Sequence, residues 1–134
     1  MKILIGNAFS MTLIRNHQVT IGEIEISELK SLALSNGVVS YWGHENSRKA
    51  AEGVLGVSLA TKVMRPAIEL SPEGYPMLYG EEYSECYVLS PEYKSNFRPA
   101  IGVEVPADAI AAWHALHVRW DRTNDADKLN SKGK

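Results

Sequence analysis

The opening strand constrains the fold of this chain more than any other feature. Ile3, Leu4 and Ile5 form an uninterrupted apolar run near the N-terminus. A strand without polar alternation is typical of a position buried on both faces, which favours a sheet covered by helices. Gly6 and Asn7 follow as a turn signal, so the strand is expected to end there. We therefore predict an α/β or α+β fold in which this strand is central.

Strand and helix patterns follow along most of the chain. Further strands are expected at 18–25, 38–42, 60–70, 77–79, 85–89 and 114–120, and helices at 8–14, 27–34, 50–55 and 107–112. Gly37 and Gly56 are the expected stops of two helices, and 90–99 is expected to be a loop. The 134 residues fit one domain, which we assign to 1–123, with the polar segment 124–134 as a flexible tail.

Composition and charge argue against several classes of protein. The net charge of −2 offers no basic face for long DNA or RNA, which requires many phosphate contacts. No apolar run approaches the roughly 20 residues of a membrane span, and nothing at the N-terminus resembles a signal peptide. The single cysteine, Cys86, cannot form an intramolecular disulfide, which favours a reducing, cytoplasmic setting. A small ligand with a few phosphates remains compatible with this composition.

The segment 43–48 places His44 where an apolar strand ends and a helix is expected to begin. The N-terminus of a helix carries unpaired N–H groups and a partial positive charge, so it attracts phosphate. The same positive end lowers the proton affinity of an imidazole and keeps it usable for proton transfer near neutral pH. Phosphate chemistry at His44 is one interpretation of this pattern. The other interpretation is a histidine that caps the helix or is partly buried and takes part in no chemistry.

Four further residues are candidates for binding an anion. Asn7 and Ser10 lie three residues apart just after the buried strand, where ligands of open α/β sheets commonly bind. The same two residues could simply cap a helix. Arg65 precedes a proline, as does Arg98, and a surface position is the default for both.

Other polar and aromatic groups have plainer explanations. His114 and His117 are too few for a zinc site, and on a strand they would point to opposite faces, so a structural role is favoured. Glu81, Glu82 and Glu85 are expected to form a solvated acidic loop, and no metal is expected. Five aromatic residues could stack on bases but are expected to be core or dimer contacts: Tyr79, Tyr83, Tyr87, Trp113 and Trp120.

Three short motifs, in the same order, resemble the small viral ring nucleases that act as type III anti-CRISPR proteins. Members of that family open with a strand and Asn-Ala-Phe-Ser, then carry Gly-His-(Asp/Glu) after a strand, and later Arg-x-x-Ile-x-Leu. The corresponding segments here are Asn7-Ala8-Phe9-Ser10, Gly43-His44-Glu45 and Arg65-Pro66-Ala67-Ile68-Glu69-Leu70. The resemblance covers about the first 75 residues.

The resemblance implies a homodimer in which a mixed sheet of about five strands is flanked by helices. It implies cyclic tetra-adenylate as ligand, bound across the two-fold axis and cleaved without metal or other cofactor in the host cytoplasm, which would switch off type III CRISPR defence. His44 would supply the proton for the departing oxygen. Asn7 and Ser10 would hold phosphate or ribose oxygens, and Arg65 would offset phosphate charge.

The second half of the chain departs from the family pattern. Arg-Leu-x-Glu-Gly is expected late in the chain, and the closest fit begins at Arg98, a further candidate ligand-binding residue, with Ile101 in place of the glutamate. Glu92 or Glu104 could substitute for it. The missing glutamate motivates an alternative function, a sponge that sequesters a cyclic nucleotide messenger without cutting it. A protein-binding module that uses the aromatic C-terminal strand is a third hypothesis.

Overall fold

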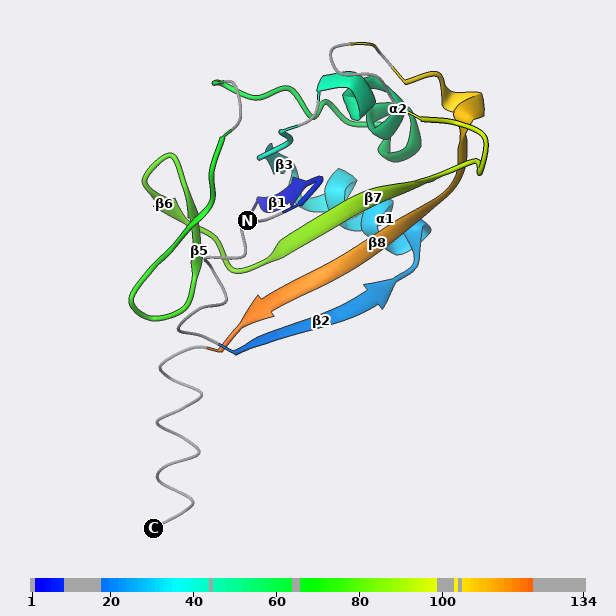
Figure 1. Cartoon of the computed structure of the whole chain (residues 1–134). Coiled ribbons are helices and arrows are strands. Elements are labelled where there is room, and N and C mark those ends of the chain that lie inside the picture. Colours follow the sequence, from blue (N-terminus) through cyan, green and yellow to red (C-terminus); the bar gives the residue numbers. More distant parts are fainter. Residues whose placement is uncertain are drawn as a thin grey trace.

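A computed structural model describes residues 2–8, 18–43, 45–63, 66–98, 103 and 105–121 (Figure 1). The strands of the larger sheet are β1 (Ile3–Gly6), β2 (Val19–Ile24), β3 (Val38–Ser40), β7 (Cys86–Tyr93) and β8 (Ile110–Trp120). The helices are α1 (Ile26–Asn36), α2 (Glu45–Leu55) and a 3-10 turn at Ala107–Ala109. Three short strands form a second sheet: β4 (Glu69–Leu70), β5 (Pro76–Leu78) and β6 (Glu81–Glu82).

Within the described residues, the larger sheet has five strands in the order β2-β8-β7-β1-β3. The strand β1 pairs in parallel with both β3 and β7, whereas β8 runs antiparallel to both β7 and β2. The sheet is therefore mixed, and the expectation of a mixed sheet of about five strands with flanking helices in one domain is confirmed.

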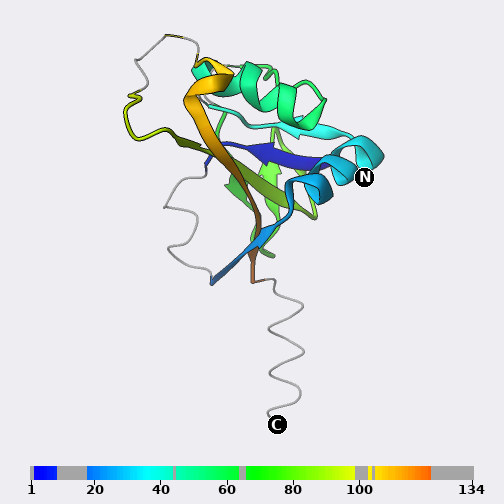
Figure 2. The same ribbon diagram turned by 90° about the vertical axis from the view of Figure 1, so that its right-hand side faces the viewer.

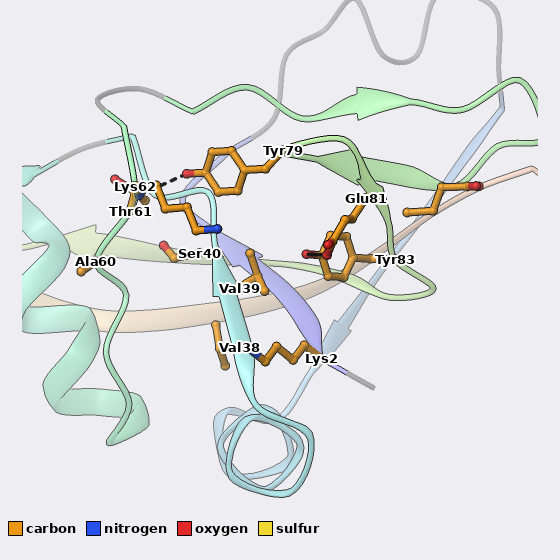
Figure 3. A pocket seen from close by; sticks show the side chains of 11 residues that line it. Lys2, Val38, Val39, Ser40, Ala60, Thr61, Lys62, Tyr79, Glu81 and Tyr83 are labelled. Atoms are coloured by element: carbon orange, nitrogen blue, oxygen red, sulfur yellow. Dashed lines mark hydrogen bonds between the residues drawn. The ribbon is translucent and has the colours of Figure 1, made fainter.

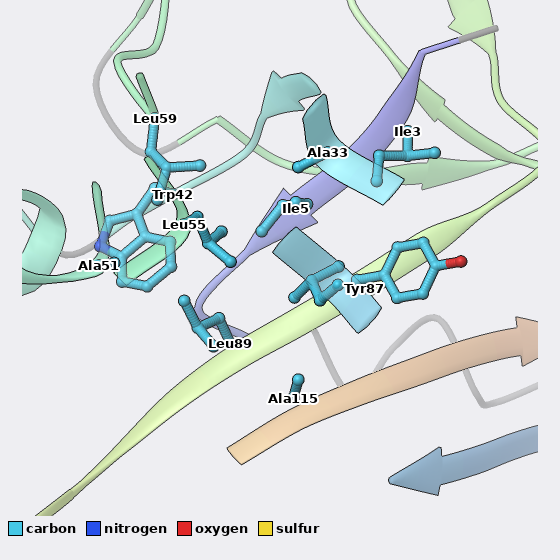
Figure 4. Close-up of a cluster of buried hydrophobic side chains, with 11 residues drawn as sticks. Ile3, Ile5, Ala33, Trp42, Ala51, Leu55, Leu59, Tyr87, Leu89 and Ala115 are labelled. Carbon is cyan, nitrogen blue, oxygen red and sulfur yellow. The ribbon is translucent and has the colours of Figure 1, made fainter. Parts of the chain in front are cut away.

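The strand β1 is buried on both faces, as its apolar run predicts. Ile3 is 4% exposed, and Leu4 and Ile5 are fully buried. Ile3 and Ile5 face the helices, in one apolar cluster, the helix-side cluster, with Ala33 of α1 and Leu55 of α2 (Figure 4). Figure 2, a view turned by 90° from that of Figure 1, shows the two helices beside the sheet. Burial of the apolar side chains on this face supplies most of the free energy that holds α1 and α2 against the sheet.

The small sheet lies against the other face of the larger sheet. Leu4 belongs to a second apolar cluster that includes Ile68 and Leu78 from the β4–β5 region, and Val118 and Trp120 from β8. The sequence did not predict this second layer, because β4 and β6 are only two residues long and show no periodicity. The sequence predicts a sheet covered by helices. In the structure, helices cover one face of β1 and the small sheet covers the other.

Both predicted helix stops are confirmed. Gly37 follows α1 with φ of 81°, and its N–H donates to the Ala33 carbonyl at 2.9 Å. Gly56 follows α2 with φ of 72°, and its N–H donates to the Glu52 carbonyl at 2.8 Å. Positive φ is readily adopted by glycine, so both residues can close a helix without a Cβ clash.

Several predicted boundaries are wrong. The described part of 60–70 is a strand only at Glu69–Leu70. The strand expected at 77–79 lies one residue earlier, at Pro76–Leu78, and the strand expected at 85–89 begins at Cys86, in the other sheet. The helix expected at 107–112 is a 3-10 turn that ends at Ala109, and β8 begins at Ile110.

The loop expected at 90–99 begins too early, because β7 continues to Tyr93. Pro91 lies within the strand, opposite Trp113 of β8. Pairing of β1 with β7 ends at Gly6 and Val88, so β1 does not require an N–H from residue 91. A proline is tolerated at such an edge position.

Two further expectations fall on residues that the structure does not describe. Most of the helix expected at 8–14 and all of the tail expected at 124–134 lie outside the described residues. Among the residues that are described, no helix combines the length and apolar character needed to cross a membrane.

Candidate functional site

The candidate site lies where the parallel strands β1 and β3 end side by side. Ile5 pairs with Ser40, and the Tyr41 N–H donates to the Ile5 carbonyl at 3.0 Å, so the pairing extends one residue past β3. Both strands run in the same direction, so the residues that follow them emerge at the same edge. Asn7 follows β1 at this edge, and Gly43 follows β3.

A side-chain hydrogen bond joins the two strand ends. The Gly43 N–H donates to Oδ1 of Asn7 at 2.8 Å, and both residues are partly buried. The location predicted for Asn7, at the mouth of the buried strand, is confirmed. Its Oδ1 is occupied by the protein backbone, which leaves Nδ2 as the group that can donate toward a ligand.

The helix α2 begins at Glu45, two residues after Gly43. Ser47, in its first turn, is 3% exposed. The backbone N–H groups in the first turn of α2, a helix of eleven residues, therefore lie beside the Asn7–Gly43 hydrogen bond. In the sequence His44 stands between Gly43 and Glu45, but His44, Ser10 and Arg65 lie outside the described residues.

A buried tyrosine, for which the sequence predicts no role, supports this edge from beneath. The Tyr41 ring packs so closely on Gly6 that an added Cβ on Gly6 would lie 2.2 Å from it. The Tyr41 hydroxyl donates to the Tyr87 carbonyl at 2.6 Å and lies 3.4 Å from Sγ of Cys86. A glycine directly before Asn7 is the one sequence signal that could have indicated a close approach there.

Cys86 is not a candidate nucleophile. It is fully buried, and burial raises the pKa of its thiol to about 12. Burial likewise raises the pKa of the Tyr41 hydroxyl well above its ordinary value. Both groups are therefore neutral at physiological pH, and their role at the site is structural.

Arg98 is directed toward its own loop. Its Nη1 donates to the carbonyls of Ser95 at 3.1 Å and Phe97 at 2.9 Å, and the side chain is exposed. The contacts of the described residues do not hold Arg98 against Asn7 or Gly43. Both bonds use Nη1, so the N–H groups of Nη2 and Nε are the donors with which this side chain can meet a ligand.

The two C-terminal histidines lie on opposite faces of β8, as predicted for a strand. His117 stacks on Tyr87 with ring centroids 5.0 Å apart, and its Nε2 lies 2.5 Å from Oε2 of Glu85. His114 bonds Glu23 at 3.2 Å, and its other ring nitrogen lies 3.8 Å from Glu92. Among the residues described, no group of three or more His, Cys, Asp or Glu side chains is arranged to hold a metal ion.

Glu92 is one of the two residues that could replace the absent family glutamate. The structure brings it near His114 on the larger sheet rather than to the Asn7–Gly43 bond. Glu104 and Ile101 lie outside the described residues.

Most of the aromatic residues are core contacts, as expected. Trp120 is 1% exposed, Tyr87 6% and Tyr83 9%, and Trp113 packs against the helix-side cluster. Tyr79 is the exception, with 39% of its surface exposed. Of these five rings, Tyr79 is the one classed as exposed, and stacking on a ligand requires an exposed ring face.

Comparison with known proteins places the chain by its fold. No protein-family model matches the sequence, and a search of curated proteins finds no match. The structure is similar to B116 of Sulfolobus turreted icosahedral virus, with a TM-score of 0.54 over 89% of this chain and 99% of that one. This chain shares the B116 fold. The two sequences are 16% identical over the match, so the similarity concerns the architecture alone.

Proposed function

We propose that this chain is a metal-independent ring nuclease that binds and cleaves a cyclic oligoadenylate, with cyclic tetra-adenylate as the foremost candidate. Loss of this second messenger would suppress type III CRISPR defence. The observation that carries the proposal is the bond from Gly43 to Asn7. It ties the residue before His44 to the end of a buried strand, beside the start of α2.

The proposed reaction is an internal transesterification. The ribose 2′-oxygen forms a bond to the adjacent phosphorus as the bond from phosphorus to the 5′-oxygen breaks. The 2′-hydroxyl loses a proton and the departing 5′-oxygen gains one, so the products are a 2′,3′-cyclic phosphate and a 5′-hydroxyl. Neither water nor a metal ion is consumed. The protein needs to align the groups, stabilise charge and deliver the proton.

Each candidate residue has a separate task in this reaction. His44 delivers the proton to the 5′-oxygen, and the N-terminus of α2 offers N–H groups to the phosphate. Asn7 donates from Nδ2, because its Oδ1 holds Gly43. By the family resemblance, Ser10 binds a ribose or phosphate oxygen and Arg65 offsets phosphate charge. Arg98 binds the ligand through the guanidinium N–H groups that its loop carbonyls do not use.

The test is cleavage of cyclic tetra-adenylate in the presence of EDTA, read by mass spectrometry. We expect linear products with 2′,3′-cyclic phosphate ends from the wild-type protein. His44→Ala should slow cleavage by about 10²- to 10⁴-fold, the usual contribution of a general acid. His114→Ala is the matched control, because that histidine is exposed on β8, two strands away from β1, and its ring nitrogens lie near the surface residues Glu23 and Glu92. Absence of turnover with any cyclic oligoadenylate would remove the proposal.

The alternative function is a sponge that binds a cyclic nucleotide and releases it intact. Two observations favour it: Ile101 replaces the glutamate of the family motif, and the neighbouring Arg98 bonds its own loop. Tight binding followed by recovery of uncut ligand after heating would select this function. In that case Ile101→Glu is the informative variant, because gain of cleavage would identify the missing group.

A further inference from the structure

A hollow of about 620 Å³ opens at the other edge of β3, away from β1 (Figure 3). We call it the β3 hollow. Its floor is Val38–Ser40, and its walls carry Lys2, Lys62, Tyr79 and the neighbouring pair Glu81 and Tyr83. Its volume lies within the range of about 300–1,000 Å³ that is typical of ligand sites. Neither Asn7 nor Gly43 lines it, so it is distinct from the candidate site above.

The floor of the hollow presents backbone groups of an edge strand. In the larger sheet β3 is the terminal strand. The carbonyl of Gly37 accepts from Ile3, and the N–H of Tyr41 donates to Ile5, so the odd-numbered residues face β1. In a parallel ladder the intervening residues then direct their N–H and C=O groups outward. Val38 and Ser40 therefore offer donors and acceptors to the hollow at the spacing of a β-strand.

The outer wall is built around Tyr79, which is held in an unusual backbone conformation. Tyr79 and Gly80 form the turn between β5 and β6, with φ of 52° and 81°. A left-handed conformation costs a non-glycine residue about 1–2 kcal/mol. The Tyr79 hydroxyl accepts from the Lys62 N–H at 3.2 Å, and Nζ of Lys62 lies 5.2 Å from the ring centroid. Backbone strain of this kind is often retained where a site is shaped.

Charged groups of both signs face the hollow, but they are not equivalent. Figure 3 shows the Lys62 ammonium directed into the open space above Val39 and Ser40, and Lys2 at its lower end. The Glu81 carboxylate instead accepts from the Tyr83 hydroxyl at 3.2 Å. A second carboxylate, that of Glu82, also lines the hollow, from the strand β6. Because the Lys62 ammonium is directed into the open space over β3, it is the group best placed to meet an acidic group that enters there.

We infer that the β3 hollow binds an extended peptide segment of a partner protein, which adds to β3 as a further strand and places an acidic side chain against Lys62. Strand addition uses main-chain bonds for affinity and alternate side chains for specificity. The outward N–H and C=O groups of Val38 and Ser40 supply the main-chain bonds. Lys62 and Lys2 supply the specificity for an acidic side chain. This inference is independent of the proposed nuclease activity.

The probe for this test is a fluorescein-labelled hexapeptide that alternates valine and glutamate, measured by fluorescence anisotropy. We expect saturable binding, and at least about tenfold weaker binding of the peptide with glutamine in place of glutamate. Methylation of alternate backbone nitrogens is the sharper test. In an added strand only one alternate set of N–H groups faces β3, so methylating that set should abolish binding, whereas methylating the other should leave it within about threefold.

Three protein variants locate the peptide. Val38→Pro removes an outward N–H at the first residue of an edge strand, where proline is tolerated, and Val38→Ala is its matched control. Lys62→Gln removes the charge from an exposed side chain and cannot be confused with loss of the fold. We expect Val38→Pro and Lys62→Gln each to weaken the acidic peptide at least about tenfold, and Val38→Ala to retain binding.

Several outcomes would overturn the inference. These are no peptide binding up to about 1 mM, equal effects of both methylated sets, or affinity that neither Val38→Pro nor Lys62→Gln changes. Binding of adenosine 5′-phosphate in the hollow, without binding of the peptide, would instead assign the site to a nucleotide. The His44→Ala protein should bind the peptide as the wild type does, so failure of the proposed nuclease function does not affect this test.

Discussion

At the residue scale, the Tyr41 ring fills the space beneath the candidate site that a side chain at residue 6 would need. An added Cβ on Gly6 would lie 2.2–2.6 Å from three ring atoms of Tyr41, and the ring is anchored by its bond to the Tyr87 carbonyl. Gly6→Ala therefore forces the ring or β1 to shift. We expect the free energy of unfolding in urea to fall by about 1–3 kcal/mol, the usual cost of overpacking a core.

Gly53 provides the control for that substitution. It lies within α2, and a Cβ there would meet no described atom within 4 Å. Alanine is favoured over glycine by about 1 kcal/mol in a helix interior, so Gly53→Ala should raise the free energy of unfolding. Equal effects of the two substitutions would contradict the close contact at Gly6.

Asn7 allows the two proposed tasks of one side chain to be separated. Asn7→Ala removes the acceptor for the Gly43 N–H, and we expect it to lower both cyclic tetra-adenylate binding and stability, the latter by about 1 kcal/mol. Asn7→Asp keeps an acceptor oxygen for Gly43 but places a negative charge near the phosphate. It should retain the stability and weaken ligand binding at least about tenfold. If both variants bind as the wild type does, Asn7 does not contact the ligand.

His114 carries the pH dependence that the described residues predict most directly. Its pKa is raised above the ordinary 6.5, first by its hydrogen bond to Glu23. The pKa of His114 is higher in the folded than in the unfolded protein, so protonated His114 stabilises the fold. This contribution is fully present below about pH 6.5 and is lost as the pH rises through the raised pKa. An NMR titration of the His114 ring should therefore have its midpoint above 6.5. Glu23→Gln should move the midpoint down, and an unchanged midpoint would exclude Glu23 as the cause.

At the element scale, the sequence predicts the strands that carry the candidate site better than the elements around it. The apolar run at Ile3–Ile5 and the β-branched run that begins at Val38 are unambiguous, and their order along the chain places Asn7 and the residues after β3 at one edge. The bond between Asn7 and Gly43 could not be predicted, because it joins residues 36 apart and depends on the register of two strands.

The elements that were mistaken share a physical cause, since each depends on a neighbour that local pattern does not reveal. Pro91 suggested a loop but is accommodated in β7, because β1 has already ended on that side. The strands β4 and β6 pair over two residues each, and their apolar neighbours Ile68 and Leu78 owe their burial to the larger sheet. Tertiary contacts of this kind override local propensity.

At the scale of the whole molecule, the fold and the function rest on different kinds of observation. The B116 architecture is shared at 16% identity, so core packing on both faces of β1 can be satisfied by very different sequences. A shared fold does not fix an activity, which depends on groups placed at a site. The proposal of ring cleavage therefore depends on the sheet edge that carries Asn7 and Gly43. It also depends on how many chains present this edge to one ligand.

A ring of four identical nucleotides presents equivalent phosphates on opposite sides, so a two-fold protein dimer can offer it two equivalent sites. We predict that calorimetry gives one cyclic tetra-adenylate for two chains, and that sedimentation with the ligand gives twice the mass of one chain. Mixed dimers of wild-type and His44→Ala chains should then retain about half the cleavage rate, because each His44 acts on its own phosphodiester. One ring bound by each monomer would contradict the dimer while leaving cleavage itself open to the EDTA assay.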